Sequence, residues 1–204
     1  MKKFIISLFL AVAAIATSHS QLVDALQEHL KFKGVPINGS LQEYVTKMKT
    51  AGFTLIKTEK DFATLQGDFA GFKNCKITVT TIKPMDLVNT INVAFPSRDE
   101  WSELESDYRQ LKTMLQHKYG APSGCVEKFD MDIDGMDVDG MGLMNVAKIM
   151  FLMHDQCTWY TAFHTRDGDI RLSIEYKDND CFVQLDYYDR LNSKAVMQQA
   201  IDDL

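Results

Sequence analysis

The most concentrated group of potential metal ligands is an acidic run in the second half of the chain. It holds five aspartates within ten residues, at Asp130, Asp132, Asp134, Asp137 and Asp139. Gly135 stands at the sixth position, where a calcium-binding loop needs a sharp turn. The twelfth position, where such a loop supplies a bidentate glutamate, is Met141 instead. We therefore expect a solvated acidic loop and no bound cofactor, with calcium binding as the alternative.

Motifs that mark the common enzyme classes are missing from the sequence. It has no Gly-x-Ser-x-Gly nucleophile elbow, no His-Glu-x-x-His zinc motif, no P-loop and no dinucleotide-binding glycine pattern. We therefore predict that the protein is not an enzyme. A hydrolase whose catalytic residues are dispersed along the chain is the alternative.

The chain has four cysteines, and none of them forms a Cys-x-x-Cys pair. In an oxidising compartment they can form disulfides. Cys125 follows a predicted helix, and Cys157 opens a later strand, so we expect a disulfide between these two. Cys75 and Cys181 then pair with each other or stay reduced.

The first twenty residues predict such a compartment. Lys2 and Lys3 precede an apolar run over residues 4–16, and small and polar residues follow up to Ser20. This is the layout of a secretory signal peptide, with residues 1–20 removed before Gln21 or at an earlier cut after Ala16. The run is too short to span a bilayer, so we expect a periplasmic or secreted protein without stable membrane insertion.

The charge of the chain excludes one class of partner. The sequence carries 22 basic and 28 acidic residues, a formal net charge of −6. Loss of the two leader lysines makes the chain more acidic still. Nucleic acids need a basic surface, so a nucleic-acid partner is not expected.

Two capping-box patterns predict the starts of helices. Ser40 with Glu43 begins one helix, which ends at Gly52, and Ser97 with Glu100 begins another, which ends at Gly120. In each, apolar residues recur at helical spacing, which indicates one buried face. The second helix should bury Trp101, Leu104, Tyr108, Leu111 and Leu115.

Alternation of apolar and polar residues predicts strands over residues 75–80, 87–95, 170–177 and 181–188. Polar turns at 166–169 and 177–180 connect the last of these into a three-stranded antiparallel meander that starts near Cys157. Ser193 should cap a short final helix.

A capped helix followed by a meander thus occurs twice. We predict an α+β fold of tandem helix-plus-antiparallel-meander modules that form one sheet with the helices on one face. Residues 21–204 would be a single domain of two similar modules, about 21–96 and 97–204. A coincidental α+β order without duplication is the alternative.

The face of this sheet that the helices leave open is the candidate binding surface. Tyrosine, histidine and arginine on a rigid sheet provide contact area and hydrogen bonds at a small entropic cost. The predicted binding residues are Tyr160, His164, Arg171, Glu175, Gln184, Asp186 and Tyr188. An ordinary solvated face is the alternative interpretation.

Several segments support a resemblance. LKFKGVPINGSLQEYVTKMKTAGF at 30–53, with CTWYTAF, IRLSIEY and CFVQLDYYDRLN later on, resembles uncharacterised secreted proteins of Bacteroides-type bacteria, a resemblance that implies no known activity. The repeated helix and meander are similar to the β-lactamase-inhibitor-protein fold, in which two modules form a sheet that grips a partner. Similarity of architecture does not transfer function.

Three functional hypotheses follow. The first is an exported, non-catalytic interaction module that binds a protein or envelope component through the open sheet face. The second is an extracytoplasmic calcium-dependent structural module organised by residues 130–139. The third is the hydrolase with a dispersed site.

Overall fold

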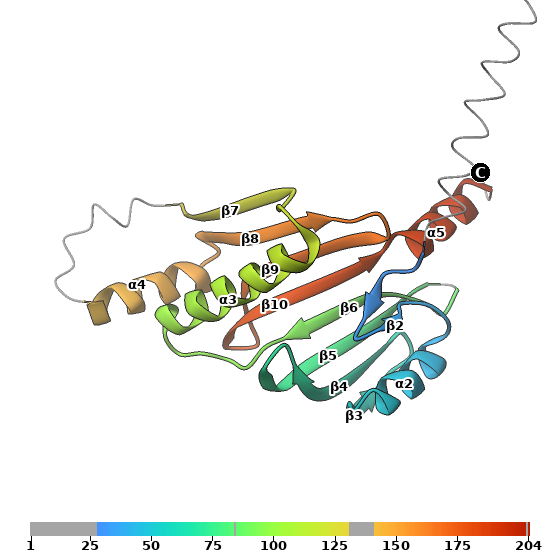
Figure 1. Ribbon diagram of the computed structural model, residues 1–204. Helices are drawn as coiled ribbons and strands as arrows, with labels where there is room; N and C mark the ends of the chain where they lie inside the picture. Colours follow the sequence, from blue (N-terminus) through green and yellow to red (C-terminus); the bar gives the residue numbers. More distant parts are fainter. Residues whose placement is uncertain (1–27, 84, 131–140, 203) are drawn as a thin grey trace, which may run out of the picture.

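The computed structural model describes residues 28–83, 85–130, 141–202 and 204. Eight strands form one antiparallel sheet in the order β3-β4-β5-β6-β10-β9-β8-β7 (Figure 1). The strands are β3 (Thr54–Thr58), β4 (Phe62–Phe69), β5 (Phe72–Ile82), β6 (Leu87–Ala94), β7 (Gly124–Phe129), β8 (Cys157–His164), β9 (Gly168–Lys177) and β10 (Asp180–Asp189). The helices are α2 (Leu41–Thr50), α3 (Trp101–Tyr119), α4 (Met141–Met153) and α5 (Arg190–Asp202), and β1 (Lys31–Phe32) pairs with β2 (Val35–Pro36).

The order of elements repeats along the chain. Helix α2 precedes the four strands β3 to β6, and helix α3 precedes the four strands β7 to β10, with α4 inserted after β7. The last strands of the two sets, β6 and β10, pair antiparallel at the centre of the sheet, with Val93 opposite Leu185. The predicted α+β class with one antiparallel sheet is therefore confirmed. The division into similar modules at about residue 96 stays a prediction.

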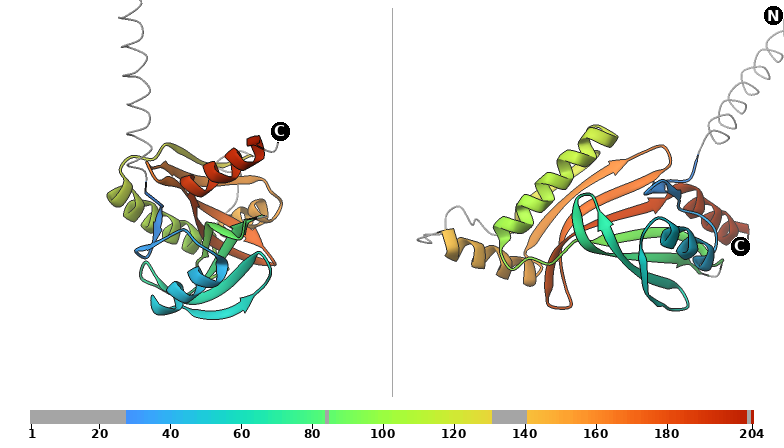
Figure 2. Two further views of the ribbon diagram at one scale, coloured as in Figure 1. Left: turned by 90° about the vertical axis from the view of Figure 1, so that its right-hand side faces the viewer. Right: turned by 60° about the horizontal axis from the view of Figure 1, so that its bottom comes forward.

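The sheet and the helices enclose one hydrophobic core. Helices α2 and α3 lie on the same side of the sheet (Figure 2). Helix α3 buries the five residues predicted for it, and α2 buries Leu41, Tyr44, Val45 and Met48. The alternating strand residues Ile77, Ile91 and Leu172 meet them and are completely buried. Burial of this apolar surface is the main favourable contribution to folding.

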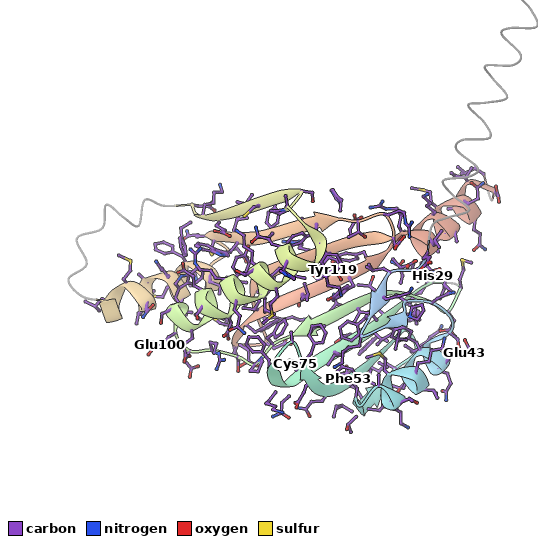
Figure 3. All side chains as sticks on the ribbon, in the orientation of Figure 1. His29, Glu43, Phe53, Cys75, Glu100 and Tyr119 are labelled. Carbon is purple, nitrogen blue, oxygen red and sulfur yellow. The ribbon has the colours of Figure 1, made fainter. Side chains whose placement is uncertain are left out.

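The two expected capping boxes have different outcomes. At α2 the box is present, because Ser40 accepts from the Glu43 amide and Glu43 reaches back to the Ser40 amide. At α3 the prediction is wrong: the helix begins at Trp101, and Glu100 is the N-cap without a side-chain cap bond (Figure 3). The Ser102 amide donates instead to Oδ1 of Asn145, from α4, at 3.1 Å. A tertiary contact thus replaces the local cap.

Three strands and one helix boundary differ from the expectation. The meander after α3 has four strands, because β7 adds to the outer edge of β8. Strands β3 and β4 lack clean alternation in the sequence, and Gly67 in β4 lies under the Phe53 ring, where a β-carbon would collide. The final helix begins at Arg190 and not at Ser193, because the Asp189 carboxylate accepts from the Asn192 amide at 2.8 Å.

Asp189 also attaches the start of the described chain to the end of the sheet. Its carboxylate is completely buried, accepts from the Leu30 amide at 2.8 Å and lies 3.2 Å from Nδ1 of His29. Figure 3 shows His29 near the junction of β10 and α5. These bonds satisfy a buried carboxylate that would otherwise be costly.

Among the described helices, none combines the length and the apolar character needed to cross a membrane. The expected signal peptide, residues 1–20, lies outside the described residues.

Candidate functional site

The strand registers place the seven predicted binding residues on one face, opposite α2 and α3, which we call the open face. Arg171 lies across from Asp186, and Asp169 lies between His164 and Tyr188 in the neighbouring row. Residues directly opposite each other in paired strands point to the same side of a sheet. The alternation in the sequence therefore fixed the side correctly.

Asp186 is the central group of this face. It is only 3% exposed, although the residues around it are polar. Asn92 of β6 donates to its Oδ1 at 2.7 Å, and Gln184 donates to its Oδ2 at 3.2 Å. Burial raises the pKa of Asp186, and the bonds from Asn92 and Gln184 and the charge of Arg171 offset this only in part. The carboxyl group is thus held in a desolvated network that spans both halves of the sheet.

Two aromatic side chains and one arginine lie around Asp186. The guanidinium of Arg171 lies over the Tyr160 ring, 5.0 Å from the centroid, and is exposed. Tyr188 is 36% exposed, and burial of its hydroxyl together with the nearby Asp186 charge raises the pKa of Tyr188 to about 12. Stacking on an aromatic face fixes the guanidinium without consuming its hydrogen-bond donors. This arrangement can receive a carboxylate or a peptide carbonyl.

The remaining predicted residues lie toward the ends of the same face. His164 is exposed, and its Nδ1 lies 2.6 Å from Oδ1 of Asp169, which also accepts from Arg190 at 2.8 Å. Glu175 is half-buried at the opposite end, across from Phe182. Neither group contacts Asp186, so they belong to the margin of the surface.

Two further residues of this face, Asn92 and Ser173, were not predicted from the sequence. Asn92 joins the network because β6 pairs with β10, a long-range pairing that alternation does not reveal. Ser173 lies between Tyr160 and Gln184 in the same row, is 1% exposed, and its hydroxyl has no hydrogen-bond partner among the described residues. Its parity in β9 matched Arg171 and Glu175, which was the available signal.

A hollow of about 230 Å³ adjoins this network on the open face. Asn92 and Gln184 line it together with Lys76, Phe182 and Lys177. The open face is therefore concave next to the Asp186 network.

The candidate calcium ligands cannot be placed as a group. Asp132, Asp134, Asp137 and Asp139 lie outside the described residues. Asp130, at the end of β7, forms a 3.5 Å ion pair with Lys128. Within the described part of the chain, histidine, cysteine and acidic side chains form no group of three that could hold a metal ion.

The expected disulfide between Cys125 and Cys157 is not formed, and all four thiols are free. The register of β7 and β8 explains why: Cys125 lies opposite Thr161, whereas Cys157 lies opposite Phe129, four residues further along. Four residues of strand correspond to about 13 Å, beyond the reach of a disulfide. Cys75 in β5 and Cys181 in β10 are separated by β6, so they do not pair either.

Comparison of the chain with protein-family models, with curated proteins and with solved structures found no match. The resemblance to secreted Bacteroides-type proteins and the architectural similarity to the β-lactamase-inhibitor-protein fold therefore stay predictions.

Proposed function

We propose that the protein is an exported, non-catalytic interaction module that binds a protein or envelope component through its open sheet face. The contact centre would be Tyr160, Arg171 and Tyr188, above the buried Asp186.

One observation carries the proposal: an exposed arginine is stacked on a tyrosine, beside a second exposed tyrosine, over a desolvated hydrogen-bond network. Tyrosine and arginine contribute most to binding when a rigid, well-packed base supports them. The sheet is such a base, since Asp186 links β10 to β6 through Asn92.

The chemistry of Arg171 indicates which group of the partner it receives. A guanidinium offers a planar pair of donors that fits a carboxylate in two parallel hydrogen bonds. We therefore propose that the partner places an aspartate, a glutamate or a chain-terminal carboxylate against Arg171.

The unpartnered Ser173 hydroxyl supports the same location. A buried hydroxyl without a hydrogen bond is costly and is uncommon in native proteins. Ser173 lies beside Tyr160, so a partner that moves the Tyr160 or Arg171 side chain could supply the missing bond. Binding would then remove the cost of leaving the Ser173 hydroxyl without a hydrogen bond in the free protein.

The test is a quantitative pull-down from a cell-envelope fraction, with the processed chain as bait. We compare the wild type with Arg171→Ala, Arg171→Lys and Ser173→Ala. Lys47→Ala, on the exposed side of α2, is the control for loss of one positive charge. Melting temperatures verify that each bait is folded.

The proposal requires at least one component that the wild type and Lys47→Ala capture equally and that Arg171→Ala captures at least tenfold less, with a partial loss for Arg171→Lys. If every captured component binds all baits equally, the open face is not the binding surface. Export is tested separately by intact-mass analysis of the protein from its native host, and retention of residues 1–20 would contradict it.

A further inference from the structure

A second cluster of reactive side chains lies on the opposite side of the sheet, where α3 passes over the edge strand β7. It consists of Lys112 from α3 and of Cys125 and Glu127 from β7. The Lys112 ammonium donates to Sγ of Cys125 at 3.3 Å and to Oε1 of Glu127 at 2.5 Å. Sγ of Cys125 in turn donates to the same carboxylate oxygen at 3.4 Å.

The other three cysteines have different surroundings. Burial raises the pKa of Cys75 to about 11 and that of Cys157 to about 12, and it also raises the pKa of Cys181. Among the four, Cys125 is the exposed thiol and the one next to an ammonium group. Thiol oxidation requires both access and thiolate character, and the thiolate is stabilised by a neighbouring cation.

The cluster is held by the core and is therefore pre-organised. The side chains of Lys112 and Glu127 are 19% and 20% exposed. Partial burial opposes the charge on Lys112, but hydrogen bonds to Glu127 and Cys125 prevail and raise the pKa of Lys112. Thr161, completely buried, contacts Sγ at 3.5 Å and bonds to the Tyr108 hydroxyl at 2.5 Å. Lys112 thus stays protonated beside an accessible sulfur.

We propose that Lys112, Cys125 and Glu127 form a thiol-oxidation site whose co-reactant is a small hydroperoxide. The thiol proton leaves to water, and the Cys125 thiolate attacks one peroxide oxygen. The S–O bond forms as the O–O bond breaks, so sulfur loses two electrons and the peroxide gains them. The Lys112 ammonium protonates the departing alkoxide to an alcohol, or the departing hydroxide to water when the co-reactant is hydrogen peroxide, and is reprotonated by solvent. The product is a sulfenic acid on Cys125.

Lys112 has two roles in this step. Its hydrogen bond to Sγ holds the ammonium against the sulfur before attack, and its proton neutralises the leaving group afterwards. Glu127 keeps the ammonium in place through their ion pair, so it is a positioning residue. Because this cluster and the open face lie on opposite sides of the sheet, the inference is independent of the proposed binding function.

The experiment treats the reduced full chain with hydrogen peroxide in the presence of dimedone, which traps sulfenic acids. Peptide mapping then measures the labelling rate of each cysteine. We expect Cys125 to be labelled at least tenfold faster than Cys75, Cys157 or Cys181. Lys112→Gln should slow Cys125 labelling about tenfold, and Lys112→Arg should restore much of the rate. Lys118→Gln, on the same helix, makes the same charge change without a contact to Sγ and should have no effect.

The labelling of Cys75 reports whether a variant is still folded, because this thiol is completely buried. If Lys112→Gln is folded and reacts as fast as the wild type, exposure alone explains the reactivity and the proposal fails. Equal labelling of all four cysteines in the folded wild type, or no labelling, also overturns it. If Lys112→Gln unfolds, Lys112→Arg provides the test. A folded Lys112→Arg variant in which Cys125 is labelled tenfold more slowly than in Lys118→Gln would contradict the role of the positive charge.

Discussion

Asp186 illustrates how a position in the sheet determines the properties of a single residue. The sequence places it on the polar side of its strand, yet the neighbouring side chains leave it almost no contact with water. Two amide donors and the nearby Arg171 charge only partly compensate for this desolvation, so the pKa of Asp186 rises. The group therefore makes the stability of the fold depend on pH.

The direction of this dependence follows from proton linkage. The folded protein binds the Asp186 proton more tightly than the unfolded chain does. The contribution of Asp186 to stability is therefore most favourable below the ordinary aspartate pKa of about 4. It is lost progressively as the pH rises from there through the raised pKa of the folded state.

Asp186→Asn should remove the pH-dependent contribution of this carboxyl group to stability. Asparagine has one acceptor oxygen for the two amide donors, which lowers stability at every pH, but relative to the wild type the variant should gain stability as the pH rises from 4 to 8. Asp180→Asn, exposed on the same strand, should show no such trend. Urea unfolding between pH 4 and pH 8 measures both variants, and a constant difference across that range would contradict the assignment.

Part of the open face follows from the sequence. Alternation alone placed Tyr160, Arg171 and Asp186 on one side, because the side-chain period of a strand is two residues. It did not reveal that Asp186 is buried or that Asn92 bonds to it. Both depend on the pairing of β6 with β10.

Helix α3 packs against the sheet and contributes its apolar stripe to the core. Its apolar stripe was readable from helical spacing, and all five predicted residues are buried. Leu111→Ala should lower the free energy of unfolding by about 2 to 5 kcal/mol through lost contacts and a residual cavity. Met114 is 45% exposed on the same helix and provides the control. Met114→Ala should change the free energy of unfolding by less than about 0.5 kcal/mol. Equal effects in denaturant titrations would show that the stripe is not packed as described.

The start of α3 provides a sharper comparison between sequence and structure. Asn145 of α4 accepts from the Ser102 amide and also donates to the Ser102 hydroxyl at 3.4 Å. Asn145→Ala should therefore lower the free energy of unfolding by about 0.5 to 2 kcal/mol, as loss of a helix cap does. Ser97→Ala should be nearly neutral, because the helix starts four residues later. A larger loss of stability for Ser97→Ala than for Asn145→Ala would instead support the capping box predicted from the sequence.

The two sets of four strands form one sheet because β6 and β10 pair over five residue positions at its centre. Apolar residues of both sets belong to the same core cluster. We infer that the domain is held by this shared core and by hydrogen bonding, without covalent cross-links among the described cysteines.

This organisation predicts that reducing agents leave stability unchanged. Thermal unfolding with and without dithiothreitol should give the same melting temperature, because no loop is closed by a disulfide. Non-reducing peptide mapping of freshly prepared protein should find four free thiols. A stability loss of about 2 to 5 kcal/mol on reduction, the usual effect of breaking a native disulfide, would contradict the structure.

Local patterns in the sequence determined the α+β class, the buried stripe of α3, the Ser40 cap and the side on which the candidate binding residues lie. Each depends on neighbours within a few positions, where backbone periodicity and capping chemistry act directly. Tertiary folding set the β6–β10 pairing, the edge position of β7, the cap that α4 provides for α3 and the burial of Asp186. It also separated Cys125 from Cys157 and placed Lys112 beside Cys125. The physical reason is that strand order and register bring together residues far apart in the chain, and local propensity contains no information on those distances.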